Sequence, residues 1–363
     1  MSKPKLMIVG GFLGAGKTTL LWKALQRLRA RNIETGLITN DQAPELVDTE
    51  WLSRGQSPVR EVAGSCFCCN FFGLDSAINS LLERDTQVIL AEPVGSCADL
   101  SATILQPIKR LRGDLDLSPF SVVLDPGRAR EALGTAASSL HIDALYILRL
   151  QLAEADIILL NKTDLLPFAE AESLAADLGR AYPQAEVRSI SATTGAGVDA
   201  WLEEMLNPQA ATGRTIIEVD YDRYAEGEAI LGWLNLTASA DEVPANGAEY
   251  LTEFLHKLEA ALQADGSSIG HVKALLTRDG NMWIGNIVHE LGEVSVRQAE
   301  GSPADTSNRL TVNARVGCSP ERLANLVNYA MQSMPGAPLP VKNLHCLKPG
   351  RPNPTHRDTT TAQ

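Results

Sequence analysis

A glycine-rich turn between an apolar strand and an amphipathic helix constrains the fold of this chain more than any other feature. The turn runs from Gly11 to Thr18 with the letters GFLGAGKT, which fit the pattern G-x-x-x-x-G-K-[ST]. An apolar run, Lys5–Val9, precedes it, and apolar residues at i, i+3, i+4 and i+7 from Leu21 form a helical stripe after it. The backbone amides of such a turn and the N-terminus of the following helix form an anion-binding cradle. The sequence therefore predicts a phosphate-binding loop.

Two side chains of this loop have distinct expected roles. We expect Lys17 to reach the β and γ oxygens of a bound nucleotide and to assist catalysis there. Thr18 is expected to offer its hydroxyl to Mg²⁺. The loop residues expected to contact the nucleotide are Gly11, Gly14, Ala15, Gly16, Lys17, Thr18 and Thr19.

The N-terminal half of the chain alternates short apolar runs with helical patterns, as parallel βαβ units do. The runs are continuously apolar, which is typical of strands covered by helices on both faces. We therefore expect an α/β fold with a doubly wound, mostly parallel sheet, whose ligand lies at the carboxyl ends of the strands. The expected strands are Lys5–Val9, Gly36–Thr39, Gln87–Ala91, Phe120–Leu124, Asp156–Leu160 and Glu186–Ser189.

A second motif, NKTD at residues 161–164, follows one of these strands. The carboxylate of Asp164 can accept two hydrogen bonds from N1–H and N2–H₂ of guanine. Adenine lacks this donor pair and would leave the carboxylate unpaired, so the motif behind a phosphate loop predicts GTP. The turn that begins at Ser191 follows another strand and can offer a backbone amide to guanine O6. The residues assigned to the base are Asn161, Lys162, Asp164, Ser191 and Ala192.

Two more strand ends are expected to face the same crevice. Glu92 closes the strand Gln87–Ala91, where phosphate-loop enzymes keep a carboxylate on the Mg²⁺ side, and Gly95 can present its amide to the γ-phosphate. Asp41 follows the strand Gly36–Thr39 and is a candidate for holding Mg²⁺ or orienting the attacking water; capping of the next segment is the structural alternative. The sequence assigns no arginine finger, so slow intrinsic hydrolysis of GTP to GDP and phosphate is expected.

Three of the six cysteines lie within four residues, as Cys66, Cys68 and Cys69. Thiolates at this spacing can chelate a soft tetrahedral ion. The cluster lies between the segments of Asp41 and Glu92, so a metal bound there would be linked to the nucleotide state. A redox pair and three packed cysteines are the alternatives.

The sequence leaves a fourth metal ligand open. Cys97 lies two residues beyond Gly95, although a lone cysteine there is also compatible with simple packing. His271 begins an alternating apolar run, where a half-buried structural histidine is the alternative.

A polar stretch that contains Pro and Gly, residues 207–214, predicts a linker between two domains. We expect the phosphate-loop domain over residues 1–206 and a smaller α+β domain over residues 215–347. Residues 348–363 are rich in Pro and Thr and are expected to be disordered. The elements expected in the second domain are the strands Thr215–Asp220, Val272–Leu276, Met282–Ile284 and Arg309–Ala314, a hairpin turn at Asp279-Gly280, and helices over residues 251–262 and 323–334.

Composition excludes several classes of partner. The net charge of −12 and the lack of a Lys/Arg-rich run argue against a nucleic-acid groove. The chain has no stretch of about 18 apolar residues, so no membrane span is predicted, and the N-terminus lacks the features of a signal peptide. We expect a cytoplasmic protein, in which clustered cysteines indicate metal or redox chemistry rather than disulfides.

The order of these motifs resembles one known family. The succession is GGFLGAGKTTL, TND (residues 39–41), SCFCC (65–69), ExxG (92–95), NKTD and SATTGAGVDAW (191–201). It resembles the CobW-type GTPases, relatives of the nickel-insertion GTPases HypB and UreG, over residues 5–205. The family's Gly-Cys-x-Cys-Cys has Ser65 in place of its glycine here, with Gly64 one residue earlier.

The resemblance implies a GTP-dependent metallochaperone that holds Zn²⁺, Co²⁺ or Ni²⁺, with Zn²⁺ favoured, on Cys66, Cys68 and Cys69. Hydrolysis would release the metal to a client metalloprotein or cofactor-synthesis enzyme, and a nucleotide-dependent homodimer is a further expectation. For the matching positions of this sequence, the resemblance implies that Lys17 and Thr18 bind phosphate and Mg²⁺.

The same resemblance implies that Glu92 is the switch carboxylate on the Mg²⁺ side and that Asp164 binds guanine. Two other interpretations stay open: a GTPase that chaperones a cofactor-dependent enzyme and has structural cysteines, and a non-catalytic zinc-binding regulator in which the nucleotide only stabilises the fold.

Overall fold

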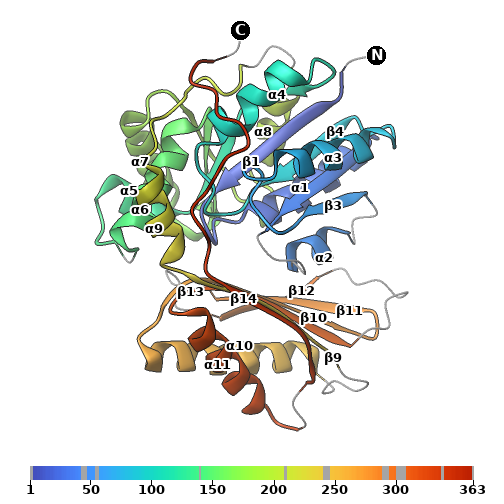
Figure 1. Cartoon of the computed structure of the whole chain (residues 1–363), viewed down its shortest axis with the longest axis vertical. Helices are drawn as coiled ribbons and strands as arrows, with labels where there is room; N and C mark the ends of the chain where they lie inside the picture. Colours follow the sequence, from blue (N-terminus) through green and yellow to red (C-terminus); the bar gives the residue numbers. More distant parts are fainter. Residues whose placement is uncertain are drawn as a thin grey trace. The chain divides into compact units, whose positions relative to one another are not determined.

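The computed structural model divides the chain into two compact units, which are interleaved in the sequence (Figure 1). The first comprises residues 1–42, 55–227 and 351–363, and the second comprises residues 43–54 and 228–350. The residues that the structure describes are 3–41, 47–53, 57–138, 140–207, 211–239, 246–287, 294–299, 308–336 and 339–361.

The first unit is built on a parallel sheet with the strand order β3-β2-β4-β1-β6-β7-β8, in which β5 also pairs with β1. Because every pairing in this sheet is parallel, the carboxyl ends of its strands meet at one edge. The strands are β1 (Lys5–Gly11), β2 (Thr35–Asn40), β3 (Val59–Val62), β4 (Val88–Glu92), β5 (Asp116–Leu117), β6 (Ser121–Leu124), β7 (Ile157–Leu160) and β8 (Glu186–Ser189).

Helices connect these strands and cover the sheet (Figure 1). All residues of β1, β2, β4, β6 and β7 are buried, which explains why their sequences are continuously apolar rather than alternating. The predicted doubly wound α/β fold is confirmed. The helices are α1 (Lys17–Ala30), α3 (Phe71–Leu82), a π-helix (Ser101–Leu105), α4 (Gln106–Leu111), α5 (Pro126–Leu133), α6 (Ile142–Glu154), a 3₁₀ turn (Thr163–Leu165), α7 (Phe168–Ala181), α8 (Val198–Leu206) and α9 (Tyr221–Ala229).

The second unit is built on an antiparallel sheet with the order β12-β11-β10-β13-β9-β14. Apolar side chains of α10 and α11 pack on it and form a core of their own. This agrees with the predicted smaller α+β domain. Its elements are α2 (Val47–Ser53), β9 (Gly232–Ser239), α10 (Gly247–Asp265), β10 (Ser268–Arg278), β11 (Asn281–Ile287), β12 (Val294–Ala299), β13 (Arg309–Gly317), α11 (Pro320–Gln332) and β14 (Val341–Leu347).

A tight hairpin joins β10 to β11. Its two central residues, Asp279 and Gly280, have φ values of 46° and 80°, as a type I′ turn requires. Arg278 pairs with Asn281 on the two sides of the turn. The predicted Asp-Gly hairpin is therefore present.

The observed boundaries differ from those expected from the sequence. Thr215–Asp220 is not a strand, because the residues at its two ends bond to side chains of the first unit. Arg214, just before the segment, donates its amide to Asp156 Oδ1 (3.1 Å), and Asp220, its last residue, donates its amide to the Tyr146 hydroxyl (2.9 Å). The second unit includes residues 43–54, and its main part begins at residue 228 rather than 215. Residues 208–210 of the expected linker lie outside the described residues.

The C-terminal segment also departs from expectation. Instead of being disordered, residues 351–361 are described and belong to the first unit, where the amides of Thr355 and Asp358 donate to the carbonyls of Cys68 (2.8 Å) and Ala102 (2.9 Å). Among the described residues, no helix has the length and apolar character needed to span a membrane.

Candidate nucleotide and metal site

The phosphate loop leaves β1 at the carboxyl edge of the sheet and leads directly into α1. Gly11 and Gly16 have φ values of 131° and 98°, a region that favours glycine. A methyl group on Gly16 would lie 2.4 Å from Nδ2 of Asn161, so this position has no room for a side chain. The turn thus has the backbone conformation and the close approach that the sequence motif predicts.

The side chains proposed for phosphate and Mg²⁺ lie together at this edge. Thr18 Oγ1 donates a hydrogen bond to Glu92 Oε1 (3.2 Å), and Lys17 Nζ lies 3.9 Å from the same oxygen. Nζ of Lys17 also donates to the carbonyl of Phe12 in the loop (3.2 Å). The side chains of Lys17, Thr18 and Glu92 are all buried. The structure therefore brings together the lysine expected at the phosphates and the hydroxyl and carboxylate expected at Mg²⁺.

The switch candidates lie beside these groups through the sheet register. Thr39 of β2 pairs with Glu92 of β4, so the following residues, Asp41 and Gly95, leave neighbouring strands. A methyl group on Gly95 would lie 3.2 Å from Nζ of Lys17. Asp41 is buried, and its amide donates to the carbonyl of Val62 (3.2 Å).

The loop that follows β7 is tied to the phosphate loop by Asn161. Its Nδ2 donates to the carbonyl of Ala15 (2.8 Å), and its Oδ1 accepts from the amide of Ala192 (2.8 Å). The amide of Ser191 donates to the carbonyl of Ala196 (2.9 Å). Both turn amides therefore have hydrogen-bond partners inside the protein, and the contact of this turn with guanine O6 stays a prediction.

The remaining residues of this motif are more open. Lys162 adopts a left-handed conformation (φ 61°), and the Thr163 hydroxyl donates to the carbonyl of Ile190 (2.9 Å). Asp164 is exposed, so its carboxylate is accessible to a ligand.

The three clustered cysteines lie in the loop between β3 and α3. Cys66 and Cys68 have their Sγ atoms 2.9 Å apart, and those of Cys68 and Cys69 are 3.8 Å apart. The three Sγ atoms all lie within 4.8 Å of one another. A tight turn closes the loop, because the amide of Cys69 donates to the carbonyl of Cys66 (3.1 Å). Gly64 supplies the left-handed residue before it (φ 92°), which explains how Ser65 can occupy the next position.

A buried asparagine at the end of β2 holds this loop. Asn40 donates from Nδ2 to the carbonyls of Val62 and Ser65 (both 2.8 Å) and accepts at Oδ1 from the amide of Phe67 (2.9 Å). Sequence reasoning predicts none of these contacts of Asn40. The one signal in the sequence is its position beside Asp41, in the segment expected to sense the phosphate.

The electrostatics of the cluster favour one thiolate. Hydrogen bonds from Cys68 and Cys69, together with an interaction with Cys97, hold the pKa of the Cys66 thiol well below its ordinary value. The same bonds to Cys66 raise the pKa of Cys68 and raise that of Cys69 to about 11. Binding of a metal by all three sulfurs would therefore release protons from Cys68 and Cys69.

Three sulfur donors from one loop, two of them buried, fit a soft cation such as Zn²⁺, Co²⁺ or Ni²⁺ better than Mg²⁺, which prefers oxygen. The structure places Cys97, left open by the sequence, beside Cys66. It places His271 in the second unit, where its Nε2 interacts with Oδ1 of Asn286 (3.4 Å).

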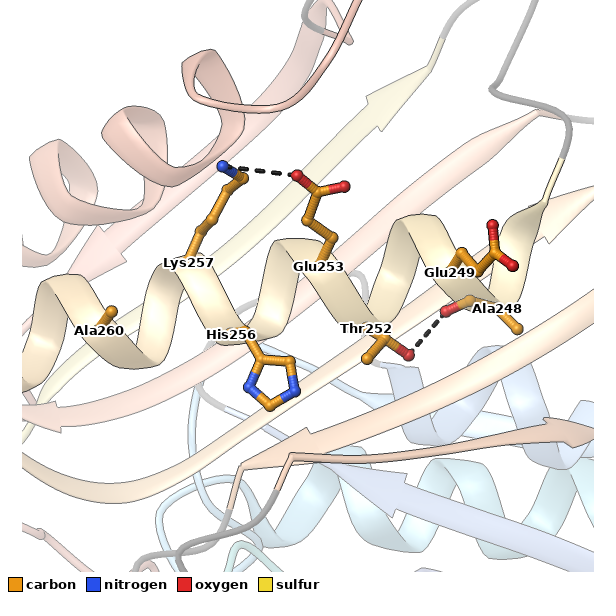
Figure 2. A pocket seen from close by; sticks show the side chains of 7 residues that line it. All are labelled: Ala248, Glu249, Thr252, Glu253, His256, Lys257 and Ala260. Carbon is orange, nitrogen blue, oxygen red and sulfur yellow. Dashed lines mark hydrogen bonds and ion pairs between the residues drawn. The ribbon is translucent and has the colours of Figure 1, made fainter.

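A separate depression of about 750 Å³ runs along α10 in the second unit. Figure 2 shows that Glu253 and Lys257 pair with each other along the helix (3.5 Å), and that the Thr252 hydroxyl donates to the carbonyl of Ala248 (2.7 Å). None of the candidate site residues lines it. Its lining is Ala248, Glu249, Thr252, Glu253, His256, Lys257 and Ala260.

The family model described as CobW/HypB/UreG, nucleotide-binding domain, matches residues 5–189. The zinc chaperone CobW of Pseudomonas aeruginosa is 28% identical over an alignment of 229 residues, which covers 54% of this chain and 58% of that protein. The urease accessory protein UreG of Staphylococcus epidermidis is 28% identical over 185 residues, 47% of this chain and 78% of that protein. The chain thus spans little more than half the length of the zinc chaperone.

Similar solved structures include HypB from Helicobacter pylori in complex with nickel, with a TM-score of 0.41 and 14% identity over 55% of this chain and 85% of that chain. The Zn(II)-bound YjiA GTPase from E. coli has a TM-score of 0.37 and 16% identity over 93% of this chain and 100% of that chain.

Proposed function

This chain belongs to the CobW/HypB/UreG family, and we propose that it is a GTP-hydrolysing metallochaperone that carries a transition metal ion on Cys66, Cys68 and Cys69. The cargo we favour is Zn²⁺, because three sulfur donors suit it. The client is expected to be a metalloprotein or a cofactor-synthesis enzyme that receives the ion after hydrolysis.

One observation carries this proposal: the cysteine loop contacts both segments that would sense the γ-phosphate. Asn40, next to Asp41, bonds to the backbone on both sides of Cys66. On the other side, the Cys66 thiol interacts with Cys97, two residues after Gly95. A shift of either segment on hydrolysis would therefore change the spacing of the sulfurs, which gives the nucleotide a physical route to the metal.

The chain's own residues divide the hydrolysis between them. Lys17 would neutralise charge on the phosphate oxygens, while Thr18 and Glu92 would hold Mg²⁺. Asp41 would orient the attacking water at the same edge of the sheet. Asp164 would select guanine, and Asn161 would keep its loop against the phosphate loop. When bound, Mg²⁺ neutralises the charge that develops on the phosphates.

The test is a competitive titration of the reduced protein with Zn²⁺, Co²⁺ and Ni²⁺, in the presence of Mg²⁺-GTP and of Mg²⁺-GDP. We expect tight binding with a thiolate absorption band for Co²⁺, and an affinity that differs between the two nucleotides. Cys66→Ser should weaken binding by more than about 100-fold, since loss of a ligand exceeds the cost of losing an outer-sphere partner. Cys318→Ser, at a half-buried cysteine of the second unit, is the matched control.

The outcomes separate the alternatives. Binding that is weak, or equally tight with either nucleotide, would make the cysteines structural and leave a GTPase with another kind of client. Metal binding without measurable GTP turnover, with and without metal, would instead make the chain a zinc-binding regulator.

A further inference from the structure

The C-terminal segment, residues 351–358, lies directly on the cysteine loop; we call it the C-terminal strap. The amide of Asn353 donates to Sγ of Cys69 (3.2 Å). Thr355 adds two bonds, from its amide to the carbonyl of Cys68 (2.8 Å) and from its hydroxyl to the carbonyl of Cys69 (3.2 Å). The strap therefore contacts one of the candidate metal ligands at its sulfur and two of them at their backbone.

The strap also packs on the helix that follows the loop. The His356 ring meets the ring of Phe71, the first residue of α3, edge to face, with centroids 4.8 Å apart. It also lies 6.3 Å from the ring of Phe72. Such aromatic contacts fix the strap in position beyond the hydrogen bonds.

The next residues of the strap bind the segment beyond Gly95. Arg357 Nε donates to Oδ2 of Asp99 (2.7 Å), whose side chain is fully buried and whose φ is 63°. The amide of Asp358 donates to the carbonyl of Ala102 (2.9 Å). The strap thus joins the cysteine loop to the segment that runs from Gly95 into the π-helix.

The part of that segment nearest Gly95 is itself firmly held. Gln151 of α6 donates from Nε2 to the carbonyls of Gly95 (3.0 Å) and Cys97 (2.8 Å). Tyr221 donates its hydroxyl to Oδ2 of Asp99 (2.7 Å). A shift of this segment therefore has to separate Arg357 from the buried carboxylate of Asp99, which would leave a buried charge without its ion-pair partner, or move the strap and with it the amide that bonds to Cys69.

We propose that the C-terminal strap is an outer part of the metal site, which positions Cys69 and transmits movement of the Gly95–Asp99 segment to the cysteine loop. This inference rests on the proposed function for its nucleotide dependence. Its positioning residues are Asn353, through its amide, and Arg357, through its ion pair. An amide hydrogen bond to a ligand sulfur orients that ligand, as outer-sphere partners do at other metal sites.

The test uses the full chain with two pairs of matched variants. Asn353→Pro removes the amide donor to Cys69, and Thr360→Pro places the same residue at an exposed position farther along the segment. Arg357→Gln removes the positive charge that faces Asp99, and Arg180→Gln removes an exposed ion pair with Asp177 on α7 instead. Thermal unfolding of each variant checks that it is folded. If Arg357→Gln alone does not fold, Asp99→Asn combined with Arg357→Gln replaces the ion pair with two neutral amides.

Two readouts are measured. The first is the rate at which iodoacetamide alkylates Cys69 in the metal-free protein, followed by peptide mass spectrometry. Because it removes the hydrogen bond to Sγ of Cys69, Asn353→Pro should change this rate several-fold relative to Thr360→Pro, and it should weaken Co²⁺ binding by about 10-fold or more. The second is the ratio of the Co²⁺ dissociation constants in Mg²⁺-GDP and Mg²⁺-GTP, which Arg357→Gln should bring close to one. Both control variants should match the wild type.

Failure of the strap inference is distinguishable from failure of the proposed function. If the ratio of the Co²⁺ dissociation constants is one in the wild type, the nucleotide-linked function is refuted, and with it the transmitting role of the strap. The alkylation rates alone then test the positioning role. A wild-type ratio different from one that is kept in Arg357→Gln, with unchanged alkylation in Asn353→Pro, overturns the strap inference and leaves the proposed function intact.

Discussion

Substitution of Asn40 by alanine tests how strongly the end of β2 holds the cysteine loop. The side chain is buried and makes three hydrogen bonds, to the carbonyls of Val62 and Ser65 and from the amide of Phe67. Alanine leaves these three backbone groups without that partner. At about 1 kcal/mol net for each bond, the loop loses about 3 kcal/mol of local stability, which corresponds to about 100-fold in its opening equilibrium.

Two measurements follow this loss. Hydrogen exchange followed by mass spectrometry should show faster exchange of the Phe67 amide, by up to about 100-fold, in a peptide that spans the cysteine loop. Co²⁺ titration should show an affinity about 10- to 100-fold weaker, because the loop must be ordered again on binding. Asn79→Ala, at an exposed asparagine of α3, is the matched control. Wild-type exchange and wild-type affinity in Asn40→Ala would refute the reasoning.

Three further predictions concern single residues of the first unit. Burial raises the pKa of Glu154 well above its ordinary value of 4.5, so its stabilising contribution is complete below about pH 4.5 and is lost as the pH rises toward the folded pKa. Relative to the wild type, the free energy of unfolding of Glu154→Gln should therefore rise as the pH increases from 4 to 7, by at most about 1.4 kcal/mol for each pH unit. Urea unfolding at several pH values measures this difference, and a difference that stays constant with pH would contradict the prediction. Asp164→Asn should reduce the preference for GTP over ATP by about 100-fold or more in competition binding while thermal unfolding stays unchanged, and an unaltered preference would exclude Asp164 as the base reader. Lys17→Ala should slow GTP hydrolysis by at least about 100-fold and preserve metal binding by the nucleotide-free protein, so equal loss of both would place the metal elsewhere.

The elements that sequence reasoning predicted well are those whose signal is local. The phosphate loop is specified by glycines at fixed spacing and by the strand and helix on its two sides, and the structure has Gly11 and Gly16 in the conformation that this spacing requires. The buried parallel strands show as apolar runs because both faces are covered. The type I′ turn at Asp279-Gly280 is encoded by two adjacent residues.

The elements that it missed have weak or ambiguous local signals. The edge strand Val59–Val62 is short and only partly buried, and its polar residues gave no apolar run. Thr215–Asp220 has the β-branched character of a strand, but the neighbouring Arg214 is bound to Asp156 of the first unit instead of extending a sheet. In both cases tertiary contacts, rather than propensity, decided the conformation.

The sequence by itself determined the apolar strands of the parallel sheet, the phosphate loop, the NKTD motif and the cysteine cluster, since each depends on residues that are close in the chain. Only the tertiary structure decided what surrounds the cysteines. Asn353 lies 284 residues from Cys69, and its Pro- and Thr-rich neighbourhood has the composition of a disordered tail. The segment is ordered because its amides, Arg357 and His356 find partners on the first unit, and a pattern in the local sequence carries no information about partners so far away.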